Sequence, residues 1–143
     1  MIRLSLLTLA VAVGISGCML QNLTPTERFS TSSHELNDAS RWGRVDIAVA
    51  HVSPKYREEF VKTRRNWGSV LQIADHDIVR MQLAEDGTSA QSRVRVSWYR
   101  MDTLSLKESY VEQRWERERG NFYLVEEAIA AGDEGLFPAQ KGG

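Results

Sequence analysis

The stretch Arg93-Val94-Arg95-Val96-Ser97-Trp98 decides the fold of this chain. Apolar residues alternate strictly with polar ones along it, and successive side chains of a β-strand point to opposite faces of the sheet. One face of this strand is therefore expected to be dry and the other wet. Antiparallel sheets that pack on one side and meet solvent on the other have this pattern.

Further strands are expected on both sides of this stretch. Apolar residues recur with a period of two in residues 70–83, which predicts one long strand or a bulged pair of strands. The Asp86-Gly87 pair that follows is typical of a hairpin turn. In the strand that follows, Val111, Gln113 and Trp115 share one side. The predicted order is strand 70–83, turn 85–88, strand 93–100, turn 101–103, a strand around 111–116, turn 119–121 and strand 122–125.

Helical spacing precedes the strands. Ser53-Pro54 is predicted to supply an N-cap and a first-turn proline, and Gly68 lies where a C-terminal glycine is expected. Tyr56, Phe60, Thr63 and Trp67 line one face of this amphipathic helix. Residues 34–52 are expected to form one broken helix or two short ones.

Helices followed by an antiparallel meander predict an α+β fold. The chain resembles the nuclear-transport-factor-2-like superfamily, which has a cystatin-like α+β fold. The resemblance covers residues 33–127. It implies N-terminal helices packed into a curved sheet of about four long strands, with a cone between the two layers; a different helix-plus-sheet lipoprotein fold is the alternative. It rests on the helix after Ser53-Pro54, on strand 93–100, and on Val111-Glu112-Gln113-Arg114-Trp115 followed by Gly120-Asn121-Phe122-Tyr123-Leu124.

The first residues of the chain predict export. Arg3 precedes an apolar run over residues 4–13, which is too short for a transmembrane helix. Ile15-Ser16-Gly17-Cys18 then resembles the lipobox of bacterial lipoproteins. The resemblance implies cleavage before Cys18, lipid attachment to its sulfur and, because Met19 rather than Asp follows, an outer-membrane destination facing the periplasm. A plain signal peptide with a chance cysteine is the alternative.

These assignments divide the chain into four parts. We expect a signal peptide over 1–17, a lipidated tether over 18–32, an α+β domain over 33–129 and a flexible C-terminal tail over 130–143. Part of the tether could instead begin the first helix, at Pro25-Thr26-Glu27. Without the leader the chain carries 17 basic and 19 acidic residues, which argues against nucleic-acid binding. With Cys18 lipidated, no cysteine is left for a disulfide.

The candidate chemical groups are few, so we expect no catalytic residue, no metal site and no cofactor. Asp75-His76-Asp77 is the most suggestive cluster, but on a regular strand the two carboxylates point away from the imidazole. Enzymes of the resembled superfamily commonly use an Asp, a His or a Tyr that projects into the cone. Among the residues expected to face inward on the last strands, Gln113 is the only polar one. It could orient a ligand, or it could be a buried amide with satisfied hydrogen bonds.

The sequence favours a non-catalytic binding or accessory module, held on the membrane through Cys18 and serving an envelope protein partner. The mixed charges around Arg114 could form ion pairs on a solvated sheet face or a docking surface for such a partner. One alternative is a binder of small apolar ligands; a small isomerase or lyase is the other, if an inward Asp or His exists. The cone of a ligand binder would be lined by Trp42, Phe60, Trp67, Trp98, Gln113 and Trp115.

Overall fold

A computed structural model describes residues 23–139, and its first helix, α1, spans Pro25–Arg41. Thr24 is the N-cap. Its hydroxyl accepts a hydrogen bond from the Glu27 N–H at 3.2 Å, and the Glu27 carboxylate accepts one from the Thr24 N–H at 2.7 Å. This reciprocal capping box stabilises the helix start. The tether expected to run to residue 32 is therefore wrong from residue 25 onward, and the alternative start at Pro25 is confirmed.

Three short helical segments follow α1. They are α2 (Val45–Ala48), the 3-10 helix η2 (Val49–His51) and α3 (Arg57–Arg64). The expected cap at Ser53 is wrong, because α3 begins after Tyr56 with no side-chain cap. Ser53 instead donates its backbone N–H to the Leu124 carbonyl at 2.9 Å, which ties this turn to the sheet. Gly68 has a φ of +82°, the left-handed conformation that glycine adopts at little cost.

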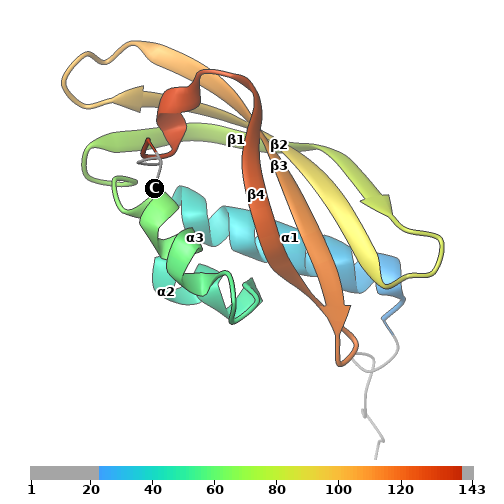
Figure 1. Ribbon diagram of the computed structural model, residues 1–143. Coiled ribbons are helices and arrows are strands. Elements are labelled where there is room, and N and C mark those ends of the chain that lie inside the picture. Colours follow the sequence, from blue (N-terminus) through green and yellow to red (C-terminus); the bar gives the residue numbers. More distant parts are fainter. Residues whose placement is uncertain (1–22, 140–143) are drawn as a thin grey trace, which may run out of the picture.

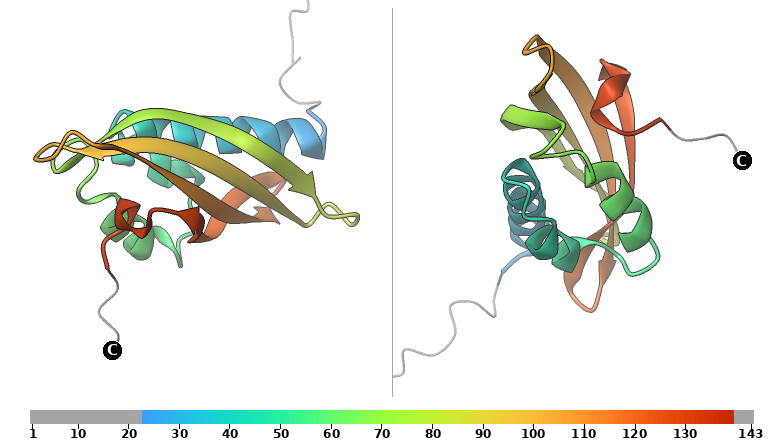
Figure 2. Two further views of the ribbon diagram at one scale, coloured as in Figure 1. Left: turned by 90° about the horizontal axis from the view of Figure 1, so that it is seen from above. Right: turned by 90° about the vertical axis from the view of Figure 1, so that its left-hand side faces the viewer.

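The sheet is an antiparallel meander of four long strands, as predicted. The order in space is β1-β2-β3-β4, so that β1 and β4 are its edges, and the helices cover one face (Figure 1, Figure 2). The α+β fold class is confirmed. The strands span Leu71–Leu83 (β1), Ser89–Arg100 (β2), Leu106–Glu118 (β3) and Asn121–Gly132 (β4).

The face of the sheet beneath the helices is filled with side chains. In β2 the alternation appears directly, since Val94, Val96 and Trp98 are at most 4% exposed while their sequence neighbours are partly exposed. Trp98 and Trp115 are among the largest fully buried side chains. Phe29 of α1 packs edge-on against Trp115, with ring centroids 5.8 Å apart. The space between helices and sheet is therefore a close-packed core.

The C-terminal strap, residues 133–139, packs against the domain. The Asp133 N–H donates to the Glu108 carbonyl at 2.8 Å, and a 3-10 helix, η3 (Glu134–Leu136), follows. Leu136 is 1% exposed. The flexible tail expected from residue 130 is thus wrong for residues 130–139, because β4 continues to Gly132 and the strap buries an apolar side chain. Among residues 23–139, no helix is both long and apolar enough to cross a membrane.

Candidate functional site

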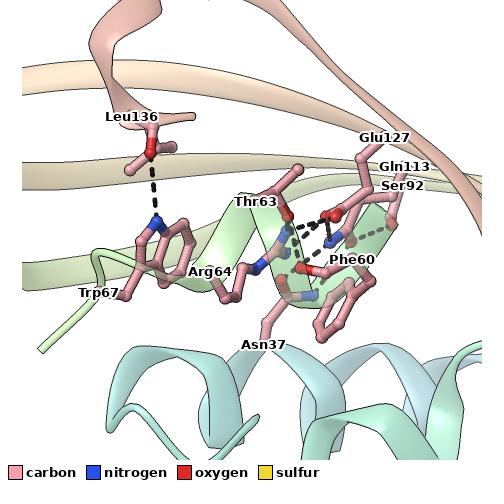
Figure 3. A network of polar contacts seen from close by, with 9 residues as sticks. All are labelled: Asn37, Phe60, Thr63, Arg64, Trp67, Ser92, Gln113, Glu127 and Leu136. Atoms are coloured by element: carbon pink, nitrogen blue, oxygen red, sulfur yellow. Dashed lines mark hydrogen bonds and ion pairs between the residues drawn. The ribbon is translucent and has the colours of Figure 1, made fainter. Parts of the chain in front are cut away.

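A buried ion pair joins the end of α3 to β4 (Figure 3). The two terminal nitrogens of Arg64 donate to the two carboxylate oxygens of Glu127, at 2.5 and 2.8 Å. The side chains are 2% and 0% exposed, respectively. Bidentate, charge-assisted pairing of this kind is among the strongest polar contacts in proteins. It fixes α3 against the edge of the sheet.

Gln113 extends this pair into a network that crosses the domain. Its amide nitrogen donates to Glu127 at 2.9 Å and to Asn37 of α1 at 3.0 Å. Its oxygen accepts from Asn37 at 3.1 Å and from the Ser92 hydroxyl at 2.9 Å. An amide side chain has two donors and two acceptor sites, so Gln113 is fully used. Gln113 is therefore a buried amide with satisfied hydrogen bonds, one of the two roles expected for it, and its partners are side chains.

Three aromatic rings surround the Arg64 guanidinium. Its central carbon lies 4.2 Å from the ring centroid of Phe60, 4.7 Å from that of Trp67 and 5.2 Å from that of Phe137. The Trp67 indole N–H also donates to the Leu136 carbonyl at 3.2 Å (Figure 3). Cation–π contacts of this type gain strength when the charge is removed from water. The C-terminal strap thus completes the enclosure of the cation.

The six predicted ligand-contacting residues do not form one cavity. Phe60, Trp98 and Trp115 are at most 1% exposed and belong to the packed core. Trp67 lies beside Arg64, and Gln113 lies in the polar network. Trp42 was wrongly assigned to the cone: it is 73% exposed, because it caps the C-terminal end of α1 on the outer surface. The predicted lipid site, Cys18, lies outside the described residues.

Sequence reasoning missed Arg64, Glu127 and Asn37. Glu127 was overlooked because the fourth strand was expected to end at residue 125, whereas β4 continues to Gly132. A signal for Arg64 was present. Phe60 and Trp67 flank it at positions i−4 and i+3, which are its neighbours on a helix surface.

The Asp75-His76-Asp77 cluster is divided among three separate partners. His76 lies 3.1 Å from Asp38, while Asp75 pairs with Arg41 and Asp77 with Arg95. Burial lowers the pKa of His76. No group of three or more His, Cys, Asp or Glu side chains in residues 23–139 is arranged to hold a metal ion.

An open groove lies between α3, β4 and the C-terminal strap, with a volume of about 800 Å³. We call it the α3–β4 groove. Tyr56 lines it, and burial together with the nearby Glu127 charge raises the pKa of its phenol above the ordinary value of 10. The residues that line the groove are Tyr56, Glu59, Lys62, Thr63, Arg65, Glu127, Ala128, Ile129, Glu134, Phe137, Pro138 and Ala139.

The buried carboxylate beside the groove, Glu127, is already engaged. Glu127 is an inward-facing acidic group of the kind that catalysis in a cone requires. However, its oxygens accept three hydrogen bonds, two from Arg64 and one from Gln113, and its side chain is fully buried. Glu127 therefore serves as a structural acceptor, and the groove is left with the Tyr56 hydroxyl, apolar side chains and the surface charges of α3 and the strap.

The sequence matches no protein-family model and no curated protein. Among solved structures, a SEC-C motif-containing protein from Rhodopseudomonas palustris is 15% identical, with a TM-score of 0.54 over 66% of this chain and 73% of that one. A protein of unknown function with a cystatin-like fold, from Nostoc punctiforme, is 11% identical, with a TM-score of 0.50 over 73% and 88%. At such identities these likenesses concern the fold alone. They support the cystatin-like α+β architecture that the sequence resemblance implied.

Proposed function

We propose that this chain is an exported, lipid-anchored lipoprotein of a bacterial cell envelope that acts as a non-catalytic binding module. The proposed anchor is Cys18, which follows the lipobox residues Ile15-Ser16-Gly17. Two or three acyl chains at one cysteine provide stable membrane attachment, whereas a single chain gives only marginal binding.

The proposed anchor precedes the domain by a short stretch of sequence. Thr24, the N-cap of α1, follows Cys18 by six residues. A fully extended chain of six residues spans at most about 20 Å. The start of α1 and the C-terminal strap lie toward opposite ends of the domain (Figure 1, Figure 2). An anchor before α1 would therefore hold the domain close to the bilayer and leave the strap end facing away from it.

The main support for a binding function is the α3–β4 groove, which lies beside a filled core. Its volume of about 800 Å³ falls within the range typical of ligand sites. Binding is favoured over catalysis because Glu127, the inward carboxylate, is held by Arg64 and Gln113. The same observation counts against an isomerase or lyase. Because Trp98 and Trp115 fill the interior, the groove rather than the cone is the proposed ligand site.

Two measurements on the full-length protein in a bacterial host test the proposal. Labelling with an alkyne fatty acid should depend on Cys18, and Cys18→Ala should move the protein out of the membrane fraction, whereas Met19→Ala should leave labelling intact. A photo-crosslinking residue at Lys62, in the groove, should form adducts, while one at Arg80, on the far edge of the sheet, should form few. Labelling of Cys18→Ala, or equal adducts at both positions, would contradict the proposal.

A further inference from the structure

We propose that the α3–β4 groove binds a short extended peptide, which adds as a strand to the free edge of β4 and places one acidic side chain against Arg65. This inference rests on the proposed binding function and specifies the partner: a mostly apolar protein segment. It follows from the edge of the sheet, from the regular part of β4 and from the charges around the groove.

The backbone of β4 forms one wall of the groove. Glu127, Ala128 and Ile129 are consecutive residues, and all three line it. Side chains of adjacent strand residues point to opposite faces, so three in a row can line one groove only if the strand edge faces it. Since β4 is the last strand in the sheet order, that edge has no neighbouring strand within residues 23–139. Apart from the Glu127 N–H, which faces the Tyr56 hydroxyl, the backbone groups of this edge are available to an added strand.

The beginning of such an addition is already present. Val52 and Leu124 form an isolated parallel bridge, and the Ser53 N–H donates to the Leu124 carbonyl at 2.9 Å. The chain then turns away into α3. Within residues 23–139, no other backbone segment hydrogen-bonds to the outer edge of β4 beyond Leu124. A peptide would therefore continue the pairing from the point where the 52–53 segment leaves the edge.

The regular part of β4 limits the length of the peptide. Register shifts against β3 leave Val125 and Ala130 without partners, and bulged residues of this kind interrupt an edge. Between them, residues 126–129 keep a regular register opposite 111–114. We therefore expect about four residues of the peptide to pair. On the opposite edge of the sheet, Arg41 of α1 occupies the Ala74 carbonyl of β1, to which it donates at 2.9 Å.

The charges around the groove define the side chains that the peptide should carry. Lys62 pairs with Glu58 at 3.2 Å, whereas the Arg65 side chain is exposed and its guanidinium has no partner among residues 23–139. An acidic side chain of the peptide would complement Arg65. Glu134, on the strap, and Glu59, near Tyr56, would repel a strongly acidic segment. A single carboxylate among apolar residues that contact Ile129, Phe137 and Pro138 therefore fits best.

A defined probe tests the charge complementarity. It is a fluorescein-labelled peptide of alternating threonine and valine with one central glutamate, titrated into the purified protein and followed by fluorescence anisotropy. Replacing its glutamate by lysine should weaken binding about three- to fivefold, as expected for an exposed ion pair. Arg65→Glu should reverse this preference, and the matched control Arg80→Glu should keep it. An unchanged preference in Arg65→Glu would overturn the assignment of Arg65.

Backbone methylation tests the strand addition itself. Methyl groups on alternate backbone nitrogens of the probe remove the donors that would pair with β4 and leave its side chains unchanged. We expect affinity to fall about tenfold or more, because two hydrogen bonds are lost. Equal binding of the methylated probe would overturn strand addition, as would failure of every probe to bind. In either case the proposed function stands as long as Cys18-dependent labelling and crosslinking at Lys62 are observed.

Discussion

Arg64 of α3 and Glu127 of β4 are 63 residues apart in sequence, yet they form a bidentate ion pair that is almost completely removed from water. Desolvating two charges is expensive, and the attraction between them offsets this only when further contacts support both groups. Here the guanidinium packs against the Phe60 ring, and the carboxylate accepts an additional hydrogen bond from Gln113. The pair therefore locks one specific packing of α3 on the sheet.

Breaking this pair from one side should be strongly destabilising. In Glu127→Gln the Arg64 charge remains buried without its counter-charge, and we expect the free energy of unfolding to fall by about 3–5 kcal/mol. The double variant Arg64→Met/Glu127→Leu leaves no buried charge and should lose much less. Urea unfolding followed by circular dichroism measures both. A double variant as unstable as the single one would show that the destabilisation does not come from the unpaired charge.

The C-terminal strap should contribute to stability. Leu136 is 1% exposed, and its truncation in Leu136→Ala should cost about 2–5 kcal/mol through lost burial and a cavity. Glu134→Ala, at an exposed strap position, is the matched control and should change stability by less than about 0.5 kcal/mol. Thermal and urea unfolding provide the measurement. If Leu136→Ala were as stable as the control, the strap would not be part of the folded domain.

Gly132 should be among the glycines least tolerant of substitution. It has a φ of +80°, and an added Cβ would lie 2.3 Å from the Glu108 carbonyl oxygen. Gly120 has a similar φ of +83°, but a Cβ there would meet nothing within 4 Å. Both alanine variants carry the cost of the left-handed backbone, about 1 kcal/mol, and Gly132→Ala carries the steric clash in addition. Equal unfolding free energies for the two variants would contradict this close approach.

His76 should make stability depend on pH. Burial lowers its pKa below the ordinary value of 6.5, although Asp38 acts in the opposite direction. The unfolded chain therefore binds a proton before the folded protein does, so this stabilising contribution is present above about pH 6.5 and is lost as pH falls through the lower pKa of the folded state. Unfolding free energies at pH 7.5 and 5.5 should differ less in His76→Gln than in the wild type. If the change in unfolding free energy between pH 7.5 and 5.5 were the same in both proteins, groups other than His76 would cause the pH dependence.

Several sequence predictions were confirmed because they depend on local periodicity. The alternation around Val94, Val96 and Trp98 predicted which face of β2 is buried. The shared side of Val111, Gln113 and Trp115 predicted the buried face of β3, where all three are at most 2% exposed. In both strands the two-residue period of side chains is a property of the extended backbone, and the burial of one face follows from it.

The predictions about element ends and about the site were weaker for a physical reason. The start of α3 was misplaced because Ser53, which resembles a helix cap, uses its backbone to pair with Leu124 of a distant strand. Trp42 was placed in the cone from its helical spacing, yet α1 ends there and the ring is 73% exposed. Local spacing does not reveal which contact a residue makes when two are available.

The sequence by itself determined the α+β class, the number and order of the strands and the buried face of β2 and β3, since these follow from hydrophobic periodicity and turn residues. Only the tertiary structure decided that Arg64 meets Glu127, that the strap covers them and that the core is filled. These contacts join segments far apart in sequence. Their energies depend on desolvation and on the geometry of several side chains at once, which no local pattern encodes.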